Sequence, residues 1–193
     1  MSGKRLYSIP QIYGIAVKAF RGAGTMARGR KSGVLDEKLQ ERIMLAVTAV
    51  NSCPMCSYAH TEMALKAGMS DAEIKNLMSG EFDDVPDDEL RAVLFAQHYA
   101  DAGSRITRDT FGEIVKAYGQ EKADCILAAT RAIMFGNSVG IVFSSLKSRF
   151  KGEGGDERSS IGYELAVILC LLPMLILSVL QALIMNLLHL PKI

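Results

Sequence analysis

The sequence predicts an all-α protein that ends in a hydrophobic helix. Apolar residues recur every three or four positions through residues 35–150, which is the spacing of one face of an α-helix. No segment shows the alternation of apolar and polar residues that is typical of a strand, and no internal repeat is evident. Residues 165–190 form an unbroken run of 26 positions without Asp, Glu, Lys or Arg.

A length of 193 residues favours one domain with an appendage, and we predict four segments. The linker among them, KGEGGDERSS, is polar and rich in glycine, which is typical of a flexible connection. The segments are a basic N-terminal arm (1–34), a helical domain (35–150), a flexible linker (151–160) and a hydrophobic C-terminal segment (161–193).

The basic arm has seven Lys and Arg residues and no acidic residue up to position 35. It can be a transit peptide, an amphipathic helix on anionic lipid, or a helix that docks on the domain. Its basic residues are Lys4, Arg5, Lys18, Arg21, Arg28, Arg30 and Lys31. The whole chain is nearly balanced, with 22 Lys and Arg against 21 Asp and Glu, so we expect no nucleic acid partner.

The helical domain divides into six helical patterns with recognisable ends. Asp, Ser and Thr cap helix starts by accepting a hydrogen bond from a free backbone N–H, and glycine ends helices because it adopts the left-handed conformation easily. The predicted caps are Asp36, Ser70 and Thr107, and the predicted stops are Gly68, Gly80, Gly103 and Gly119. The predicted helices span 36–50, 54–66, 70–80, 86–103, 107–118 and 120–150. Gly136 and Gly140 inside the last one indicate a kink or a close helix crossing.

The hydrophobic segment is long enough to cross a bilayer, whose core of ~30 Å needs about 20 apolar residues in a helix. Every face of this segment is apolar, whereas burial against a domain requires only one apolar stripe. A membrane span is therefore favoured over a helix that is buried in the core or in a subunit interface. Four basic residues precede the segment and one follows it, which predicts a cytoplasmic domain anchored by this helix. They are Lys147, Arg149, Lys151 and Arg158 before it and Lys192 after it.

The stretch NSCPMCSYAH (51–60) holds two of the four cysteines and one of the three histidines. Pro54 is favoured at the first position of a helix, so Cys53 is the expected N-cap and both sulfurs lie on the first turn. This spacing permits a disulfide, and the positive end of the helix dipole favours a thiolate. His60 lies one turn beyond Cys56 on the same face. A dithiol with an imidazole within reach is suited to proton-coupled sulfur chemistry.

Two other interpretations of this stretch stay open. A structural zinc site needs four ligands, of which Cys53, Cys56 and His60 supply three. Glu41 or His98 would have to be the fourth. Alternatively, the two thiols and the histidine are buried for packing alone. Sparse cysteines with one CxxC pair indicate a reducing compartment and a reactive or metal-binding pair, not a secreted disulfide scaffold.

Residues 41–68, ERIMLAVTAVNSCPMCSYAHTEMALKAG, resemble the carboxymuconolactone decarboxylase superfamily in its alkylhydroperoxidase D-like branch. That branch carries Glu, eleven residues, Cys, two residues, Cys, three residues and His. Glu41, Cys53, Cys56 and His60 have that spacing here. The resemblance covers about residues 35–150 and implies an oligomeric, all-helical bundle of the alkylhydroperoxidase D type.

The resemblance also implies a thiol peroxidase or disulfide reductase that needs no metal, flavin or other cofactor. Cys56 would attack the hydroperoxide, Cys53 would resolve the sulfenic acid to a disulfide, and Glu41 with His60 would relay the proton. The helix dipole favours a thiolate at Cys53 instead, but the neighbouring His60 supports the family's assignment of Cys56. Met55 stands where peroxidase members can carry a histidine, so one proton donor is missing. An external thiol or a lipoyl-type donor would supply the electrons.

We therefore expect an enzyme that reduces organic hydroperoxides at the cytoplasmic face of a membrane, where lipid hydroperoxides are suitable substrates. The alternative is a membrane-tethered redox sensor or interaction module that uses the same CxxC pair and reacts once instead of turning over. Lactone decarboxylation is disfavoured, because the decarboxylase branch does not rely on this cysteine pair.

Overall fold

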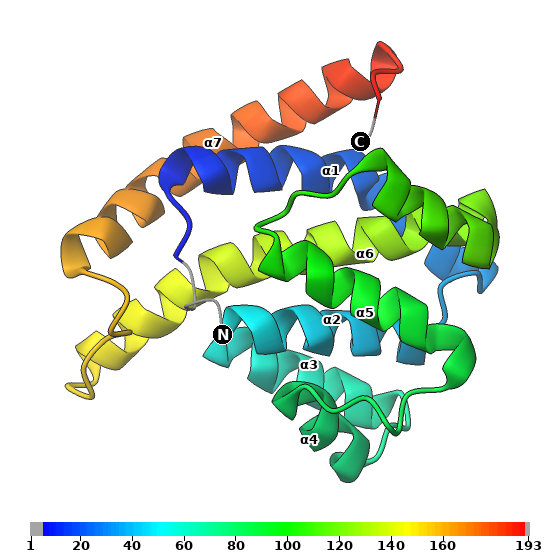
Figure 1. The fold of residues 1–193 in the computed structure, drawn as a ribbon. Helices are drawn as coiled ribbons and strands as arrows, with labels where there is room; N and C mark the ends of the chain where they lie inside the picture. Colours follow the sequence, from blue (N-terminus) through cyan, green and yellow to red (C-terminus); the bar gives the residue numbers. More distant parts are fainter. Residues whose placement is uncertain (1–5, 192–193) are drawn as a thin grey trace.

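A computed structural model describes residues 6–191, and this part of the chain is all-helical, as predicted. Figure 1 shows the arrangement of its helices. They are α1 (Ile9–Ser32), α2 (Glu37–Asn51), α3 (Pro54–Lys66), α4 (Asp71–Ser79), α5 (Asp87–Asp101), α6 (Arg108–Phe150) and α7 (Ile161–Leu187). Lys4, Arg5 and Lys192, which contributed to the charge arguments above, lie outside the described residues.

The predicted helix caps are confirmed by their hydrogen bonds. The side chains of Asp36, Ser70 and Thr107 each accept from the backbone N–H three residues further on, at the starts of α2, α4 and α6. Gly119 interrupts α6 with φ 76° and ψ 162°, so the predicted stop at this glycine is a break between two helical stretches. Its positive φ is the reason that a glycine is favoured at this position.

The long α6 is the centre of the fold, and α1, α2, α3, α5 and α7 all pack against it. Its second stretch is buried around Ile126 and Met134, which share one hydrophobic core with Ile43 and Val47 of α2 and Ile12 of α1. A smaller cluster joins α4 to α2 and α5. The helix that bears the CxxC pair, α3, therefore rests on a rigid core of α2 and α6.

The N-terminal α1 is a docked helix in this structure. It lies between α6 and α7 in Figure 1, and it makes extensive contacts with both. Ile12, Ala16 and Val17 of α1 are buried. Even the charged Arg21 is buried, with only 8% of it exposed.

The hydrophobic α7 lies along the outer side of α1 in Figure 1, and the two helices run in the same direction. One face of α7 is buried through Val167, Met174 and Ala182. The opposite face exposes large apolar side chains along the whole helix. They include Leu165, Leu169, Leu172, Ile176, Leu180, Leu183, Ile184 and Leu187.

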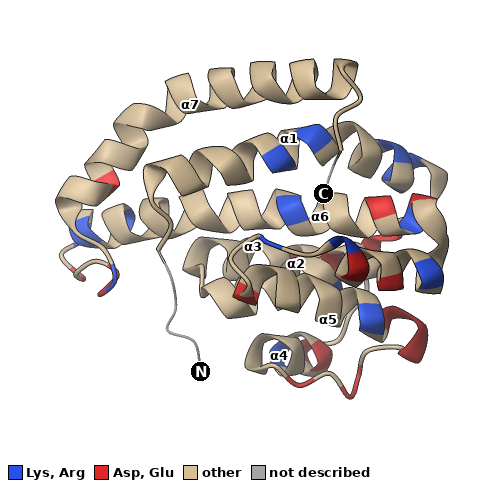
Figure 2. Cartoon of the chain, turned by 45° about the horizontal axis from the view of Figure 1, so that its top comes forward, with Lys and Arg blue, Asp and Glu red and all other residues tan. Residues whose placement is uncertain are grey.

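By length and composition, both α6 and α7 can cross a membrane, but α6 is mostly buried within the domain and α7 is mostly exposed. Figure 2 shows α7 almost free of charged residues, whereas acidic residues gather around α4 and the start of α5. Polar contacts tie α7 to α1. The Tyr13 hydroxyl donates to Gln181, and the Arg21 guanidinium donates to the backbone oxygens of Leu190 and Pro191.

The segment 151–160 connects α6 to α7 and touches the domain close to the CxxC pair. Arg158 pairs with Asp156 and donates to the backbone oxygens of Asn51 and Ser52 at 3.1 and 3.3 Å. These two carbonyls end α2 immediately before Cys53. The connection therefore holds the helix end on which the candidate site is built.

Candidate active site

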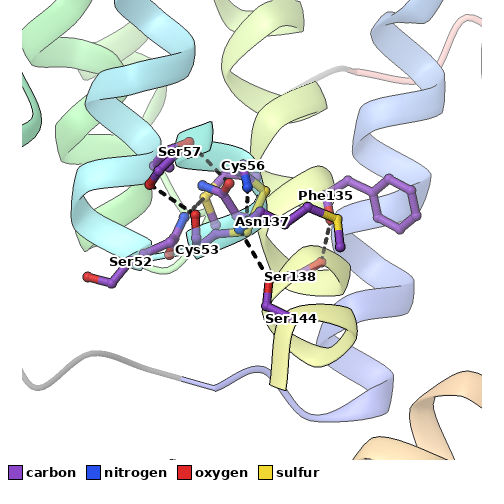
Figure 3. Close-up of a disulfide and its surroundings, with 12 residues drawn as sticks. Ser52, Cys53, Cys56, Ser57, Phe135, Asn137, Ser138 and Ser144 are labelled. Carbon is purple, nitrogen blue, oxygen red and sulfur yellow. Dashed lines mark hydrogen bonds between the residues drawn. A yellow bond between two sulfur atoms is a disulfide. The ribbon is translucent and has the colours of Figure 1, made fainter. Parts of the chain in front are cut away.

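Cys53 and Cys56 form a disulfide at the start of α3 in this structure (Figure 3). Their Cα atoms are 5.3 Å apart, within the range that a disulfide spans. Cys53 is the N-cap, as predicted, and its sulfur accepts the Cys56 N–H at 3.3 Å. Pro54 at the first helical position and Ser52 in the left-handed conformation, with φ 53°, make the abrupt turn from α2 into α3.

The backbone of α6 forms the wall behind the disulfide. A Cβ at Gly140 would stand 2.7 Å from the Cys53 sulfur and 2.8 Å from the Cys56 sulfur, so no side chain fits there. One turn further on, the Ser144 hydroxyl accepts the Met55 N–H at 3.1 Å. The predicted close helix crossing is thus correct at Gly140, whereas a Cβ at Gly136 would make only an ordinary 3.7 Å contact within its own helix.

Glu41 and His60 form a second pair beside the dithiol. Glu41 Oε2 lies 2.7 Å from His60 Nδ1, and Glu41 Oε1 accepts from Gln40 at 3.0 Å. Glu41 is 2% exposed, which excludes a solvated surface glutamate. A carboxylate on Nδ1 orients the ring and leaves Nε2 as the nitrogen that can exchange a proton with a reacting group.

The structure thus pairs Cys53 with Cys56 and Glu41 with His60, and His60 lies one turn beyond Cys56 on α3. Among the described residues, no hydrogen bond joins the His60 ring to either sulfur. Cys53 is fully buried and Cys56 is 8% exposed, so Cys56 is the more accessible residue of the pair. This difference favours Cys56 as the attacking thiol, although the backbone N–H on the Cys53 sulfur stabilises a thiolate at that position.

A further polar residue beside the disulfide was missed by the sequence analysis. Asn137 of α6 is fully buried, and Figure 3 shows it next to the two cysteines. Its Oδ1 accepts from the Thr48 hydroxyl at 3.1 Å, while no hydrogen-bond partner of its Nδ2 is found within residues 6–191. A buried donor without a partner is costly, so it is available to a sulfur anion or to a bound oxygen. Its position three residues before Gly140 was the only sequence signal.

The surface in front of the CxxC pair is hollowed and partly apolar. A cavity of about 280 Å³ is lined by Met55, Tyr58, Ser144 and Lys147, among others. Met55 is 43% exposed and Tyr58 is 74% exposed, so this cavity offers apolar surface to a substrate. The cavity is bordered by Pro54 and Met55, the two residues between the cysteines.

The residues considered for a zinc site do not converge. Within residues 6–191, no group of three or more His, Cys, Asp and Glu side chains is placed to hold a metal ion. His98, one of the two fourth ligands considered, is exposed on α5, whereas Glu41 is paired with His60.

A comparison with protein-family models matches residues 16–97 to the carboxymuconolactone decarboxylase family. The match begins within α1, includes Glu41, the CxxC pair and His60, and ends within α5. The resemblance to this superfamily, predicted over about residues 35–150, is confirmed over residues 35–97. No curated protein and no solved structure matches the chain.

Proposed function

With residues 16–97 matching the carboxymuconolactone decarboxylase family, we propose that the chain is a dithiol peroxidase that reduces organic hydroperoxides through Cys56 and Cys53. The observation that carries this proposal is the arrangement of two pairs at one site. A disulfide-forming CxxC lies at the start of α3, and His60, one turn further along α3, pairs with the buried Glu41 of α2.

The proposed cycle has three balanced steps. The Cys56 thiolate attacks the distal oxygen of ROOH, the O–O bond breaks, and the alkoxide takes a proton and leaves as ROH. The Cys53 thiol then attacks the Cys56 sulfenic acid, which forms the disulfide and releases water. An external dithiol reduces the disulfide by exchange and becomes oxidised itself.

Glu41 and His60 supply the proton transfers in this cycle. Glu41 holds His60 through Nδ1, so Nε2 can take the proton of the Cys56 thiol and return it to the leaving alkoxide. In the disulfide, Cys56 has no thiol proton that His60 could accept. It is therefore compatible with this oxidised state that, among the described residues, no hydrogen bond joins the His60 ring to either sulfur. The Asn137 Nδ2, for which no partner is found among the described residues, would donate to a developing negative charge.

The experiment is hydroperoxide consumption by the full-length protein in detergent, with cumene hydroperoxide and dihydrolipoamide. We expect many turnovers for the native chain and none for Cys56→Ser. Cys53→Ser, assayed without dihydrolipoamide, should consume one equivalent and then stop, because no second protein thiol can resolve its sulfenic acid. Full activity in both variants would exclude the dithiol mechanism.

A redox sensor with the same CxxC pair is the second candidate, and one observation favours it. Met55 occupies the position between the cysteines, where a histidine would offer a further proton donor, and both sulfurs are largely buried. A sensor would form the disulfide with one equivalent of hydroperoxide and would show no steady-state consumption with excess dithiol. The same assay therefore distinguishes the two candidates.

We further propose that α7 holds the protein to the cytoplasmic face of a membrane. The exposed half of α7 is apolar over its full length, and a soluble protein seldom exposes such an extended apolar face. Because α7 lies along α1 over much of its length, this face can enter the lipid while the helix stays docked on the domain. On α3, the exposed Met63 and Leu65 support a homo-oligomer that covers them.

A further inference from the structure

A cavity of about 550 Å³ lies between α1, α7 and the loop that joins α5 to α6. None of its lining residues belongs to the CxxC pair or to the Glu41–His60 pair. Four basic side chains line it, and within residues 6–191 neither Asp nor Glu does. The basic residues are Lys18 and Arg21 of α1, Arg105 of the loop and Arg131 of α6.

The hydrogen bonds of Lys18 and Arg105 leave room for an anion. Lys18 Nζ donates to the Ser104 backbone oxygen at 2.7 Å, and Arg105 Nε donates to the Ala102 backbone oxygen at 3.4 Å. In the part of the chain that is described, no carboxylate lies within ion-pair distance of Lys18 or Arg105. Lysine and arginine have several N–H groups each, so one carbonyl contact does not exhaust them.

Like charges crowd this cavity. Burial lowers the pKa of Lys18, and the positive charges of Arg131 and Arg105 lower it further. Burial and Arg131 lower the pKa of Arg21 in the same way. A bound anion would offset this repulsion, and charge-assisted hydrogen bonds to it would be among the strong ones.

The rest of the lining is apolar or aromatic. Val17 and Ile106 contribute aliphatic surface, Met185 and Pro191 add apolar surface from α7 and the residues after it, and the Tyr13 ring closes one side. The cavity therefore pairs a cationic patch with an apolar wall, and it adjoins the helix whose outer face we assign to lipid.

We propose that this cavity binds the anionic head of an amphiphile, a carboxylate or a phosphate ester that carries an alkyl chain. The head lies against Lys18 and Arg105, and the chain follows the wall formed by Val17 and Met185. Free phosphate offers the same head without the chain, so the apolar wall distinguishes the two. The site is separate from the dithiol, and binding to it does not require peroxidase turnover.

The test is calorimetric titration of the full-length, oxidised protein in phosphatidylcholine nanodiscs, with empty nanodiscs as the blank. The probes are octanoate, octyl phosphate, octanol and inorganic phosphate. We expect saturable binding of octanoate or octyl phosphate at one site per chain, and no saturable binding of octanol. Inorganic phosphate that binds as tightly as octyl phosphate would contradict the role of the apolar wall.

The test variant is the double variant Lys18→Gln with Arg105→Gln. The control is Lys75→Gln, on the exposed side of α4. Lys18 and Arg105 are chosen because neither is fully buried, and circular dichroism verifies that the double variant is folded. Loss of a charged hydrogen-bond partner should weaken octanoate binding by about tenfold or more, whereas the control should bind like the native chain. No saturable binding, or equal binding in a folded double variant, would overturn the proposal.

Discussion

Gly140 of α6 lies directly against the Cys53 sulfur, at a distance where a Cβ would stand 2.7 Å away. Contacts this short are not tolerated between a side-chain carbon and a sulfur, so the glycine allows α3 to rest on the α6 backbone. The dithiol is thereby held between the start of one helix and the bare backbone of another.

Gly140→Ala should therefore disturb the CxxC pair, while Gly136→Ala should not. Alanine at position 136 meets only an ordinary contact and should raise the stability by up to about 1 kcal/mol, because alanine favours the helix. Alanine at 140 should lower the thermal midpoint and slow the oxidation of the dithiol by at least about tenfold, an effect of about 1.4 kcal/mol on the barrier. Thermal unfolding and thiol titration check both variants. Equal behaviour of the two would show that the close approach has no consequence.

Glu41→Gln should keep the fold and lose most of the peroxidase activity. The amide can still contact His60, but it removes the negative charge that stabilises a protonated ring. We expect kcat/KM for cumene hydroperoxide to fall by about 10²-fold, the lower range for loss of general acid–base catalysis. Glu62→Gln, on the exposed side of α3, is the control and should keep the native rate. A native rate in Glu41→Gln would remove the pair from the mechanism.

Octanoate binding should depend on pH through Lys18. Only protonated Lys18 attracts the carboxylate, and burial together with Arg131 and Arg105 lowers its pKa from the ordinary 10.5. The affinity should be constant at neutral pH and fall as the pH rises through the lowered pKa, earlier than a solvent-exposed lysine would allow. Tyr99 also lines the cavity, but burial raises its pKa, so Lys18→Gln should abolish the early fall. An unchanged pH profile in that variant would assign the titration to another group.

The exposed face of α7 should bind lipid vesicles. We expect the native chain to float with vesicles of phosphatidylcholine and phosphatidylglycerol, and Leu172→Glu with Leu183→Glu to stay in the soluble fraction. Two charges on this face cost several kcal/mol when they are moved into hydrocarbon, which is enough to release the protein. Glu62→Gln serves again as the control. If the native chain instead forms a defined oligomer and does not bind vesicles, the exposed face of α7 is an interface with a second copy of the chain.

The elements that the sequence predicted well are those that depend on local chemistry. Caps such as Asp36, the break at Gly119 and the N-cap role of Cys53 follow from hydrogen bonds and backbone conformations within a few residues. The Glu41–His60 contact depends instead on the turn between α2 and α3, so spacing suggested it only through a family resemblance. Asn137 was not predicted as a site residue, because a close helix crossing explained the neighbouring Gly136 without a role for the asparagine.

Tertiary contacts also decide how α7 lies. Hydropathy identifies a helix that can cross a membrane. Hydropathy contains no information about which other residues this helix contacts. The contacts of Gln181 with Tyr13 and of Asn186 with Arg21 come from residues more than 160 positions apart in the sequence. These contacts dock one face of α7 on α1, which no local pattern predicts. That α7 crosses a membrane stays a prediction, whereas in the structure α7 is docked on α1.

The most direct test of the central claim is to trap the sulfenic acid. The full-length Cys53→Ser protein receives one equivalent of cumene hydroperoxide and then dimedone, and the adduct is located by mass spectrometry. We expect one dimedone adduct on Cys56 and one equivalent of cumyl alcohol. Hydroperoxide consumed without an adduct on Cys56, or no reaction in a folded protein, would contradict it.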